Sequence, residues 1–167
     1  EMQKAALILE GGAKRGVFTS GVLDYLMEQE YYIPHVIGVS AGSCNAVDYV
    51  SRQPGRTKAC MIRSGEDGKI INFHNFFQTK SLLDMDLIFE RDPKELHPFD
   101  FDTYFASDMT CEIVVTNCES GQAEYYSEKE DGDRLMQLCR ASSSMPLVTP
   151  MVEIDGVPYL DGGIADS

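Results

Sequence analysis

Basic residues are scarce in this sequence. It has 14 Lys and Arg against 27 Asp and Glu, which gives a formal net charge of -13 at neutral pH. A chain with this balance repels a phosphate backbone and gains no counterion release from it. The composition therefore excludes nucleic acid as an expected partner, and it offers no general attraction to an anionic membrane surface.

Long apolar runs are also missing. No stretch approaches the roughly 20 apolar residues that cross a bilayer, so we expect any membrane contact to be peripheral. The apolar run at residues 5–9 is too short for the hydrophobic region of a signal peptide. These two absences favour a cytoplasmic protein, with at most peripheral association with membranes.

Paired cysteines and metal-ligand motifs are absent as well. The 5 cysteines form no C-x-x-C pair and have no metal-ligand spacing with His35, His74 or His97. We therefore expect reduced thiols, and neither a metal nor another cofactor.

What is present suits a single domain over residues 1–167, because 167 residues with 43% hydrophobic side chains can form one core. Apolar runs at 5–9 and 36–39 predict buried strands, each followed by a glycine turn and a helix. The two helices are expected over 16–30 and 42–52. Repetition of this unit is typical of an α/β protein.

Later in the chain, alternating apolar residues and turn residues predict hairpins over 111–127 and 151–160, with a helix over 133–141 between them. The pattern predicts a mixed α/β sheet sandwiched by helices. The chain stops shortly after Asp161, where such a sheet usually continues into another helix. We therefore expect a natural C-terminal portion to be missing.

The middle of the chain gives weaker signals. We expect a short helix near 56–63 and a helix over 81–90 capped by Ser81, which Pro93 and Pro98 keep from continuing. Three aromatic residues are either core or the mobile rim of an acyl pocket, namely Phe73, Phe76 and Phe77.

Residues 38–42 read G-V-S-A-G and lie between a predicted strand and a predicted helix. In this context the pattern G-x-S-x-G is typical of a nucleophile elbow, where Gly38 and Gly42 relieve crowding at a sharp turn and the serine hydroxyl is exposed. We interpret Ser40 as a candidate nucleophile. The alternative is a serine that only caps the following helix.

Residues 11–16 read G-G-A-K-R-G and lie at a second strand-to-helix turn. Consecutive N–H groups backed by a helix N-terminus stabilise negative charge, so this loop is a candidate oxyanion hole. The alternatives are a plain tight turn and a dinucleotide-binding loop, which requires glycine where Ala13 stands. Arg15 is either a solvated charge or a contact for a substrate phosphate.

A serine nucleophile needs a base, and histidines are poorly placed for that role. His35 precedes Ser40, His74 and His97 fall in the irregular middle region, and residues 98–167 contain none. Asp161, expected at a strand end, is the best remaining base, which leads to a Ser-Asp dyad. By itself, Asp-Gly-Gly is ordinary sequence for the exit of a hairpin.

Together these motifs resemble those of the patatin-like phospholipases, and the chain looks most like the compact bacterial members. Residues 10–16 are similar to the family's oxyanion loop, residues 38–42 to its nucleophile elbow, and residues 161–163 to the D-G-[AG] motif that carries its base. The resemblance extends from Leu7 to the end of the chain. It implies a three-layer helix/sheet/helix fold with a mostly parallel central sheet.

By this resemblance, Ser40 is the nucleophile, Asp161 is the proton acceptor, and the amides of Gly11, Gly12 and Ala13 form the oxyanion hole. Ala13 replaces the third glycine that is usual in this loop, although its backbone donor is unchanged. The residues that support the motifs are Arg15, Gly16, Gly38, Gly42, Gly162 and Gly163.

The resemblance implies a lipid acyl hydrolase that cleaves carboxylic esters through an acyl-serine, with a lipid or acyl-ester substrate and no metal. Two alternatives remain open. One is a Ser-His-Asp triad esterase whose histidine lies in a missing C-terminal part, and the other is a catalytically idle lipid-binding or interaction domain. The oligomeric state stays open, and we assign no chemistry to the three serines at 142–144.

Overall fold

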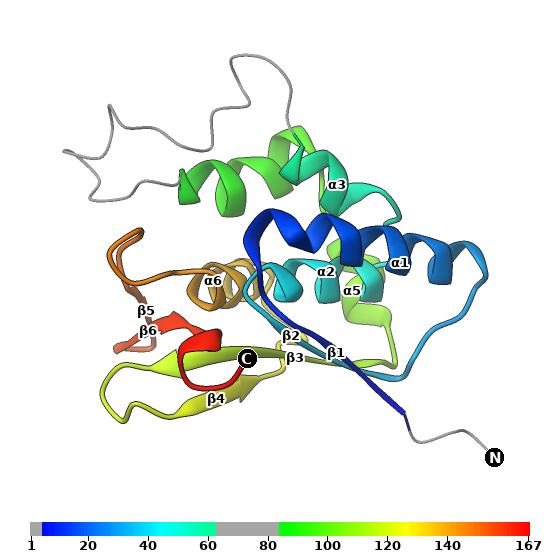
Figure 1. The fold of residues 1–167 in the computed structure, drawn as a ribbon. Helices are drawn as coiled ribbons and strands as arrows, with labels where there is room; N and C mark the ends of the chain where they lie inside the picture. Colours follow the sequence, from blue (N-terminus) through cyan, green and yellow to red (C-terminus); the bar gives the residue numbers. More distant parts are fainter. Residues whose placement is uncertain (1–4, 63–83) are drawn as a thin grey trace.

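The computed structural model describes residues 5–62 and 84–167, with helices packed on a six-stranded sheet (Figure 1). The strands are β1 (Ala6–Leu9), β2 (His35–Val39), β3 (Thr110–Asn117), β4 (Ala123–Tyr126), β5 (Val152–Ile154) and β6 (Val157–Asp161). The helical elements are η1 (Ala13–Arg15), α1 (Gly16–Glu28), α2 (Ala41–Val50), α3 (Arg56–Met61), η3 (Leu87–Leu96), α5 (Phe101–Ala106), α6 (Gly132–Ser142) and η4 (Gly162–Ile164).

The sheet has the strand order β1-β2-β3-β6-β5, and β4 pairs with β3 beside this path. The neighbours β1, β2 and β3 are parallel, and the hairpin strands β4, β5 and β6 pair antiparallel. Parallel strands end at the same edge of a sheet, which is where the sites of α/β proteins collect. The loops after β1 and β2 are therefore neighbours.

The strands β2 and β6 share one edge of β3, and β4 pairs with the other edge. β4 pairs with residues 113–116 of β3, and this stretch overlaps the part that pairs with β2 and the part that pairs with β6. Because a strand has only two edges, β2 and β6 must lie end to end on the other one. Val39 of β2 is aligned with Val114, and Asp161 of β6 is aligned with Val115. Ser40 and Asp161 therefore meet where the two strands approach each other.

The helices α1, α2 and α6 lie on one side of the sheet in Figure 1. Val36, Cys111 and Ile113 point to that side and are fully buried. On the opposite face, Ile8 is 70% exposed and Ile37 is partly exposed. The mixed α/β fold with helices flanking the sheet is thus confirmed, and the described residues form two of its three expected layers.

The elements predicted from local patterns are present with small shifts of their ends. Both strand-turn-helix units and both hairpins are confirmed. In the second hairpin, Asp155 and Gly156 both have positive φ, 53° and 81°, as expected for a tight two-residue turn. α6 buries one apolar face. No disulfide joins the cysteines that the structure describes.

The prediction that Pro93 ends the preceding helix is wrong. η3 continues through Pro93 to Leu96 with the wider turns of a π-helix. His97 N donates to Asp92 O, five residues earlier, at 2.9 Å. The helix-breaking rule for proline assumes the four-residue spacing of an α-helix, which this segment does not follow. The predictions for Phe73, Phe76, Phe77 and Ser81 lie outside the described residues.

Candidate active site

Ser40 stands at the turn between β2 and α2, in the strand-turn-helix context that the sequence predicts. Its backbone has φ 54° and ψ -125°, a strained conformation that costs a non-glycine residue of order 1–3 kcal/mol. Ser43 donates to the carbonyl oxygen of Ser40 from its amide, at 2.9 Å, and from its hydroxyl, at 2.6 Å. The first turn of α2 thus holds the strained residue.

Gly38 and Gly42 are required by close approaches around this turn. A Cβ on Gly38 would lie 2.5 Å from the carbonyl oxygen of Gly42, and a Cβ on Gly42 would lie 2.0 Å from that of Leu9. Neither position can hold a side chain unless the backbone moves. Gly38 therefore lets the start of α2 pack directly onto β2, and Gly42 lets it pack onto the end of β1.

Ser142, at the end of α6, supports the turn from behind. Its Oγ accepts a hydrogen bond from the amide of Ser40 at 2.8 Å and donates one to the carbonyl oxygen of Val114 at 2.6 Å. Ser142 is fully buried. The sequence around Ser142 predicts no such role, because its only local signal is a run of serines at the end of a helix.

Asp161 is the last residue of β6 and is 7% exposed. Its amide donates to Ser144 O at 2.8 Å, and its carboxylate Oδ1 accepts from Gly163 N at 2.9 Å. Burial raises the pKa of Asp161, while hydrogen bonds from Gly163 N and from the side chain of Ser40 oppose the rise. The register of β2 and β6 on β3 thus places the buried Asp161 beside the turn that carries Ser40.

Gly162 and Gly163 shape the turn that follows Asp161. A Cβ on Gly162 would lie 2.2 Å from the carbonyl oxygen of Val114, so only glycine fits against β3. A Cβ on Gly163 would lie 3.2 Å from Asp161 Oδ1. The Asp-Gly-Gly sequence therefore packs tightly onto β3, the strand with which β6 pairs.

The glycine loop after β1 lies against Ser40. A Cβ on Gly11 would lie 2.9 Å from Ser40 Cβ and 3.5 Å from Ser40 Oγ. The strand register explains this contact, because Leu9 is aligned with Gly38, and Gly11 and Ser40 each follow two residues later. The two predicted motifs are thus side by side.

Two further residues of this loop adopt left-handed backbone. Gly12 has φ 137°, and Ala13 has φ 49° although it is not a glycine. Gly16 approaches α2 closely, since a Cβ there would lie 3.1 Å from Ala41 Cβ. Arg15 is exposed. The replacement of glycine by Ala13 is therefore accommodated at the cost of backbone strain.

The histidines of the described residues are engaged elsewhere. His35 Nε2 lies 2.5 Å from Glu112 Oε2, and His97 Nδ1 lies 2.7 Å from Asp92 Oδ1. Within residues 5–62 and 84–167, no hydrogen bond joins a histidine to Ser40. His74 lies outside these ranges.

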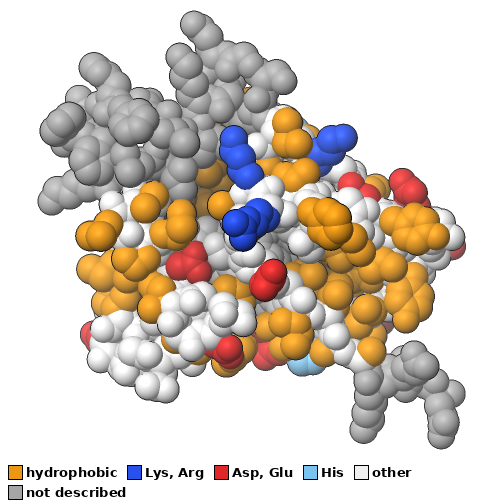
Figure 2. Space-filling model, in the orientation of Figure 1, with side chains coloured by type: hydrophobic (Ala, Val, Ile, Leu, Met, Phe, Trp, Pro, Cys, Tyr) orange, Lys and Arg blue, Asp and Glu red, His pale blue; other side chains and the backbone are white. Residues whose placement is uncertain are grey.

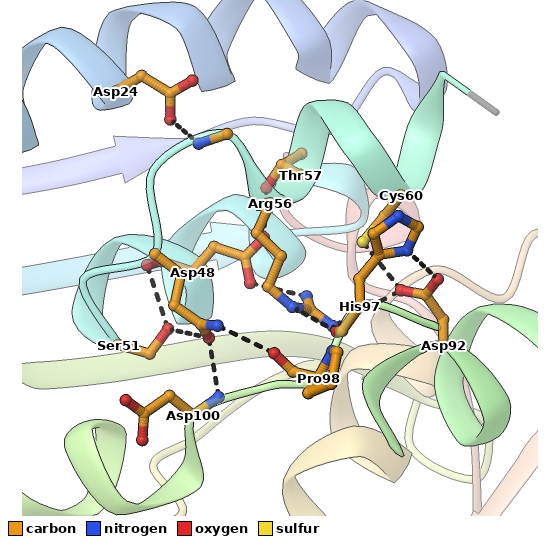
Figure 3. Close-up of polar contacts among 12 residues, drawn as sticks. Asp24, Asp48, Ser51, Arg56, Thr57, Cys60, Asp92, His97, Pro98 and Asp100 are labelled. Atoms are coloured by element: carbon orange, nitrogen blue, oxygen red, sulfur yellow. Dashed lines mark hydrogen bonds and ion pairs between the residues drawn. The ribbon is translucent and has the colours of Figure 1, made fainter. Parts of the chain in front are cut away.

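Potential metal ligands come together at a second place. Cys60, Asp92 and His97 converge between α3 and the end of η3 (Figure 3). The spacing of cysteines and histidines along the sequence did not predict this cluster. The expectation of no metal relied on that spacing, whereas this cluster is assembled by packing.

Hydrophobic side chains lie exposed over α1 (Figure 2). Phe18, Val22 and Tyr25 of α1 are 82%, 48% and 60% exposed, and their spacing places them on one face of the helix. Such exposed apolar surface is typical of contacts with apolar ligands or partners.

Comparison with known proteins identifies relatives. Residues 7–167 match the sequence model of the family described as patatin-like phospholipase. The chain is 28% identical over 169 aligned residues to "Uncharacterized protein YjjU" of Escherichia coli (strain K12). The alignment covers 98% of this chain and 46% of that protein, so the chain spans about half the length of this relative. Among the described residues, no helix is long and apolar enough to span a bilayer.

Proposed function

Because the chain belongs to the patatin-like phospholipase family, we propose that it hydrolyses carboxylic esters of lipids, with Ser40 as the nucleophile and Asp161 as the base. The family supports a lipid acyl hydrolase in general. The observation that carries the finer proposal is that the end of β2, before Ser40, and the end of β6, at the buried Asp161, lie next to each other on β3.

In the first step, Asp161 accepts the proton of Ser40 Oγ as this oxygen attacks the ester carbonyl carbon. An ordinary aspartate is a weak base near neutral pH. Burial raises the pKa of Asp161, and a carboxylate with a raised pKa takes up the serine proton more readily. This environment supports a base that needs no histidine.

The negative charge that develops on the carbonyl oxygen needs donors beside Ser40. We assign this role to the amides of Gly11, Gly12 and Ala13, because the Gly11 backbone lies against the Ser40 side chain. Outside helices and strands, the described backbone hydrogen bonds include none donated by Gly11 N or Gly12 N. These two donors therefore suit an oxyanion.

The step ends when the leaving alcohol takes the proton from Asp161 and an acyl-serine remains. A water molecule then attacks the acyl group, Asp161 again accepts a proton, and the carboxylic acid is released as Ser40 regains its proton. The sequence of steps uses no metal or cofactor.

We propose that the protein is cytoplasmic and reaches its lipid substrate through peripheral contact with a membrane surface. The exposed apolar side chains of Phe18, Val22 and Tyr25 support such contact. The net charge of -13 gives no electrostatic help at an anionic bilayer. Binding to neutral phosphatidylcholine vesicles, measured by co-sedimentation, tests this part of the proposal.

The central experiment is labelling with a fluorophosphonate, combined with hydrolysis of a short-chain p-nitrophenyl ester. We expect the wild type to hydrolyse the ester in the presence of EDTA. The fluorophosphonate should label Ser40 and abolish this activity. Ser40→Ala should remove labelling and lower kcat/KM by about a thousandfold or more, while Ser120→Ala, at an exposed turn, should change neither.

Other outcomes favour the alternatives. An unlabelled Ser40 in a folded protein supports an idle lipid-binding domain. If Asp161→Asn retains activity within about tenfold of the wild type, the triad esterase with a histidine elsewhere replaces the dyad. Loss of turnover in EDTA that calcium restores excludes the mechanism written above.

A further inference from the structure

We propose that Cys60, Asp92 and His97 form a binding site for a divalent transition metal, and that zinc is the metal it fits best. The ligand atoms of these three side chains all lie within 4.8 Å of one another. They come from α3, from η3 and from the residue after η3, and they converge in Figure 3. The site shares no residue with the proposed ester hydrolysis and goes beyond it.

Asp92 is the centre of this cluster. Its Oδ2 accepts a hydrogen bond from Cys60 Sγ at 2.9 Å, and its Oδ1 lies 2.7 Å from His97 Nδ1. In a tetrahedral zinc site with these donors, bond lengths near 2.0–2.3 Å separate neighbouring ligand atoms by about 3.3–3.7 Å. Small side-chain rotations therefore convert these contacts into a coordination shell.

The donor set selects the metal. A thiolate, an imidazole and a carboxylate are the ligand types that zinc takes in proteins, whereas magnesium and calcium prefer oxygen alone. Three protein ligands leave a fourth position for water. The His97 side chain is 34% exposed while that of Asp92 is 2% exposed, so solvent and metal reach the cluster from the His97 side.

The surrounding charges suit a divalent cation. Arg56 Nη1 lies 2.9 Å from Asp48 Oδ1, and Arg56 Nη2 lies 3.6 Å from Asp92 Oδ2. When Cys60 binds as a thiolate, it joins Asp48 and Asp92 as a third negative group against the single positive charge of Arg56. A divalent cation neutralises this group, and the thiol proton of Cys60 leaves to solvent as the metal binds.

Arg56 also holds the third ligand in place. It donates from Nε and Nη2 to the carbonyl oxygen of His97, at 3.0 and 2.9 Å. The contact uses the main chain of His97 and leaves its imidazole available. The variant His97→Ala therefore keeps these hydrogen bonds and tests the role of the imidazole alone.

The experiment uses cobalt(II) as a spectroscopic substitute for zinc, added to protein that has been freed of metal. We expect the wild type to develop a thiolate-to-cobalt charge-transfer band and the visible bands of four-coordinate cobalt, saturating at one ion per chain. Zinc should displace the cobalt. A wild type without the charge-transfer band overturns the proposal, whatever the variants do.

Matched variants locate the site. Cys60→Ser should lose the charge-transfer band, whereas Cys118→Ser, at a cysteine outside the cluster, should keep it. His97→Ala should weaken zinc binding by about tenfold or more, and His35→Ala should leave it unchanged. A band that survives in Cys60→Ser places the metal elsewhere and overturns the assignment.

A melting experiment gives an independent readout. Zinc in large excess over its dissociation constant should raise the melting temperature of the wild type by about 5 °C or more. The same zinc should leave Cys60→Ser unchanged. Equal shifts in both proteins contradict the proposal, because a metal held by Cys60 cannot stabilise the variant to the same extent.

Discussion

The amide of Ser40 donates a hydrogen bond to Ser142 Oγ, 2.8 Å away and 102 positions later in the chain. The same hydroxyl donates its only proton to the carbonyl oxygen of Val114, so it must act as an acceptor toward Ser40. The strained turn that carries the proposed nucleophile is therefore tied to β3 through one side chain. This hydrogen bond connects the end of α6 to the proposed nucleophile, Ser40.

We predict that Ser142→Ala lowers kcat about tenfold or more with little change in KM, because the amide of Ser40 loses its partner and the strained turn relaxes. The free energy of unfolding should fall by about 1–3 kcal/mol, the cost of unsatisfied buried polar groups. Steady-state kinetics and urea denaturation measure the two effects.

The control for this prediction is Ser144→Ala, in the same serine run. Ser144 Oγ donates to the carbonyl oxygen of Arg140, and Ser144 contacts Asp161 only through its main chain. It should keep the kcat of the wild type. Equal losses of kcat in both variants would contradict a specific role of Ser142.

We predict that Asp161→Asn lowers kcat/KM by about a thousandfold or more, yet unfolds no more easily at neutral pH. Burial raises the pKa of Asp161 in the folded protein, so its ionisation at neutral pH weakens the folded state. The amide cannot act as a base but avoids this penalty. Kinetics and thermal melts at neutral pH test both parts.

Asp166→Asn is the matched control, since Asp166 is exposed and its carboxylate binds the hydroxyl of Tyr125. It should retain the activity of the wild type. A clear loss of stability in Asp161→Asn at neutral pH would show that the carboxylate stabilises the fold, contrary to the direction of its pKa shift.

We predict that kcat/KM falls with decreasing pH around a midpoint above 3.8, the ordinary pKa of an aspartate. Asp161 must be ionised to accept the proton, so activity is lost as pH falls through its raised folded-state pKa. The stability contribution of this group runs the other way, since it is full below pH 3.8 and is lost as pH rises through the folded-state pKa.

Rates measured between pH 3 and pH 8, with circular dichroism at each pH, check this prediction. Only points at which the fold is intact enter the profile. An acid limb centred at or below 3.8 in folded protein means that burial does not raise the pKa of the catalytic base.

We predict opposite effects of two glycine-to-alanine changes. Gly42→Ala should destabilise the protein by several kcal/mol and abolish activity, because its Cβ would lie 2.0 Å from Leu9 O. Gly21→Ala, within α1 and with no atom within 4 Å of its Cβ, should stabilise by about 0.5–1 kcal/mol. Urea denaturation measures both. Similar stabilities for the two variants would contradict the close approach of α2 to β1.

The local elements and motifs were readable from the sequence. Apolar runs that end in glycine turns predicted β1 and β2 with the helices that follow them, and alternating residues predicted both hairpins. These signals are local, because strand and helix periodicity and turn chemistry depend on neighbouring residues. The order of the three motifs likewise indicated the family, which the match over residues 7–167 confirms.

Contacts between distant residues depended on the tertiary structure. The motifs predicted a pairing of Ser40 with Asp161, but the shared edge of β3 on which β2 and β6 meet is a register that neither strand's own pattern indicates. The local sequence around Ser142 indicates only the end of a helix, whereas packing in the folded protein places its hydroxyl against the amide of Ser40. The continuation of η3 through Pro93 also depends on hydrogen bonds that the local rule for proline does not consider.

The sequence by itself thus determined which segments turn, pair and bury their apolar faces, together with the residue types that the proposed chemistry requires. The tertiary structure alone decided which side chains meet, such as Cys60 with His97 and Ser40 with Ser142. The physical reason is that propensity and periodicity act over a few residues, whereas strand register and helix packing join groups up to about a hundred residues apart.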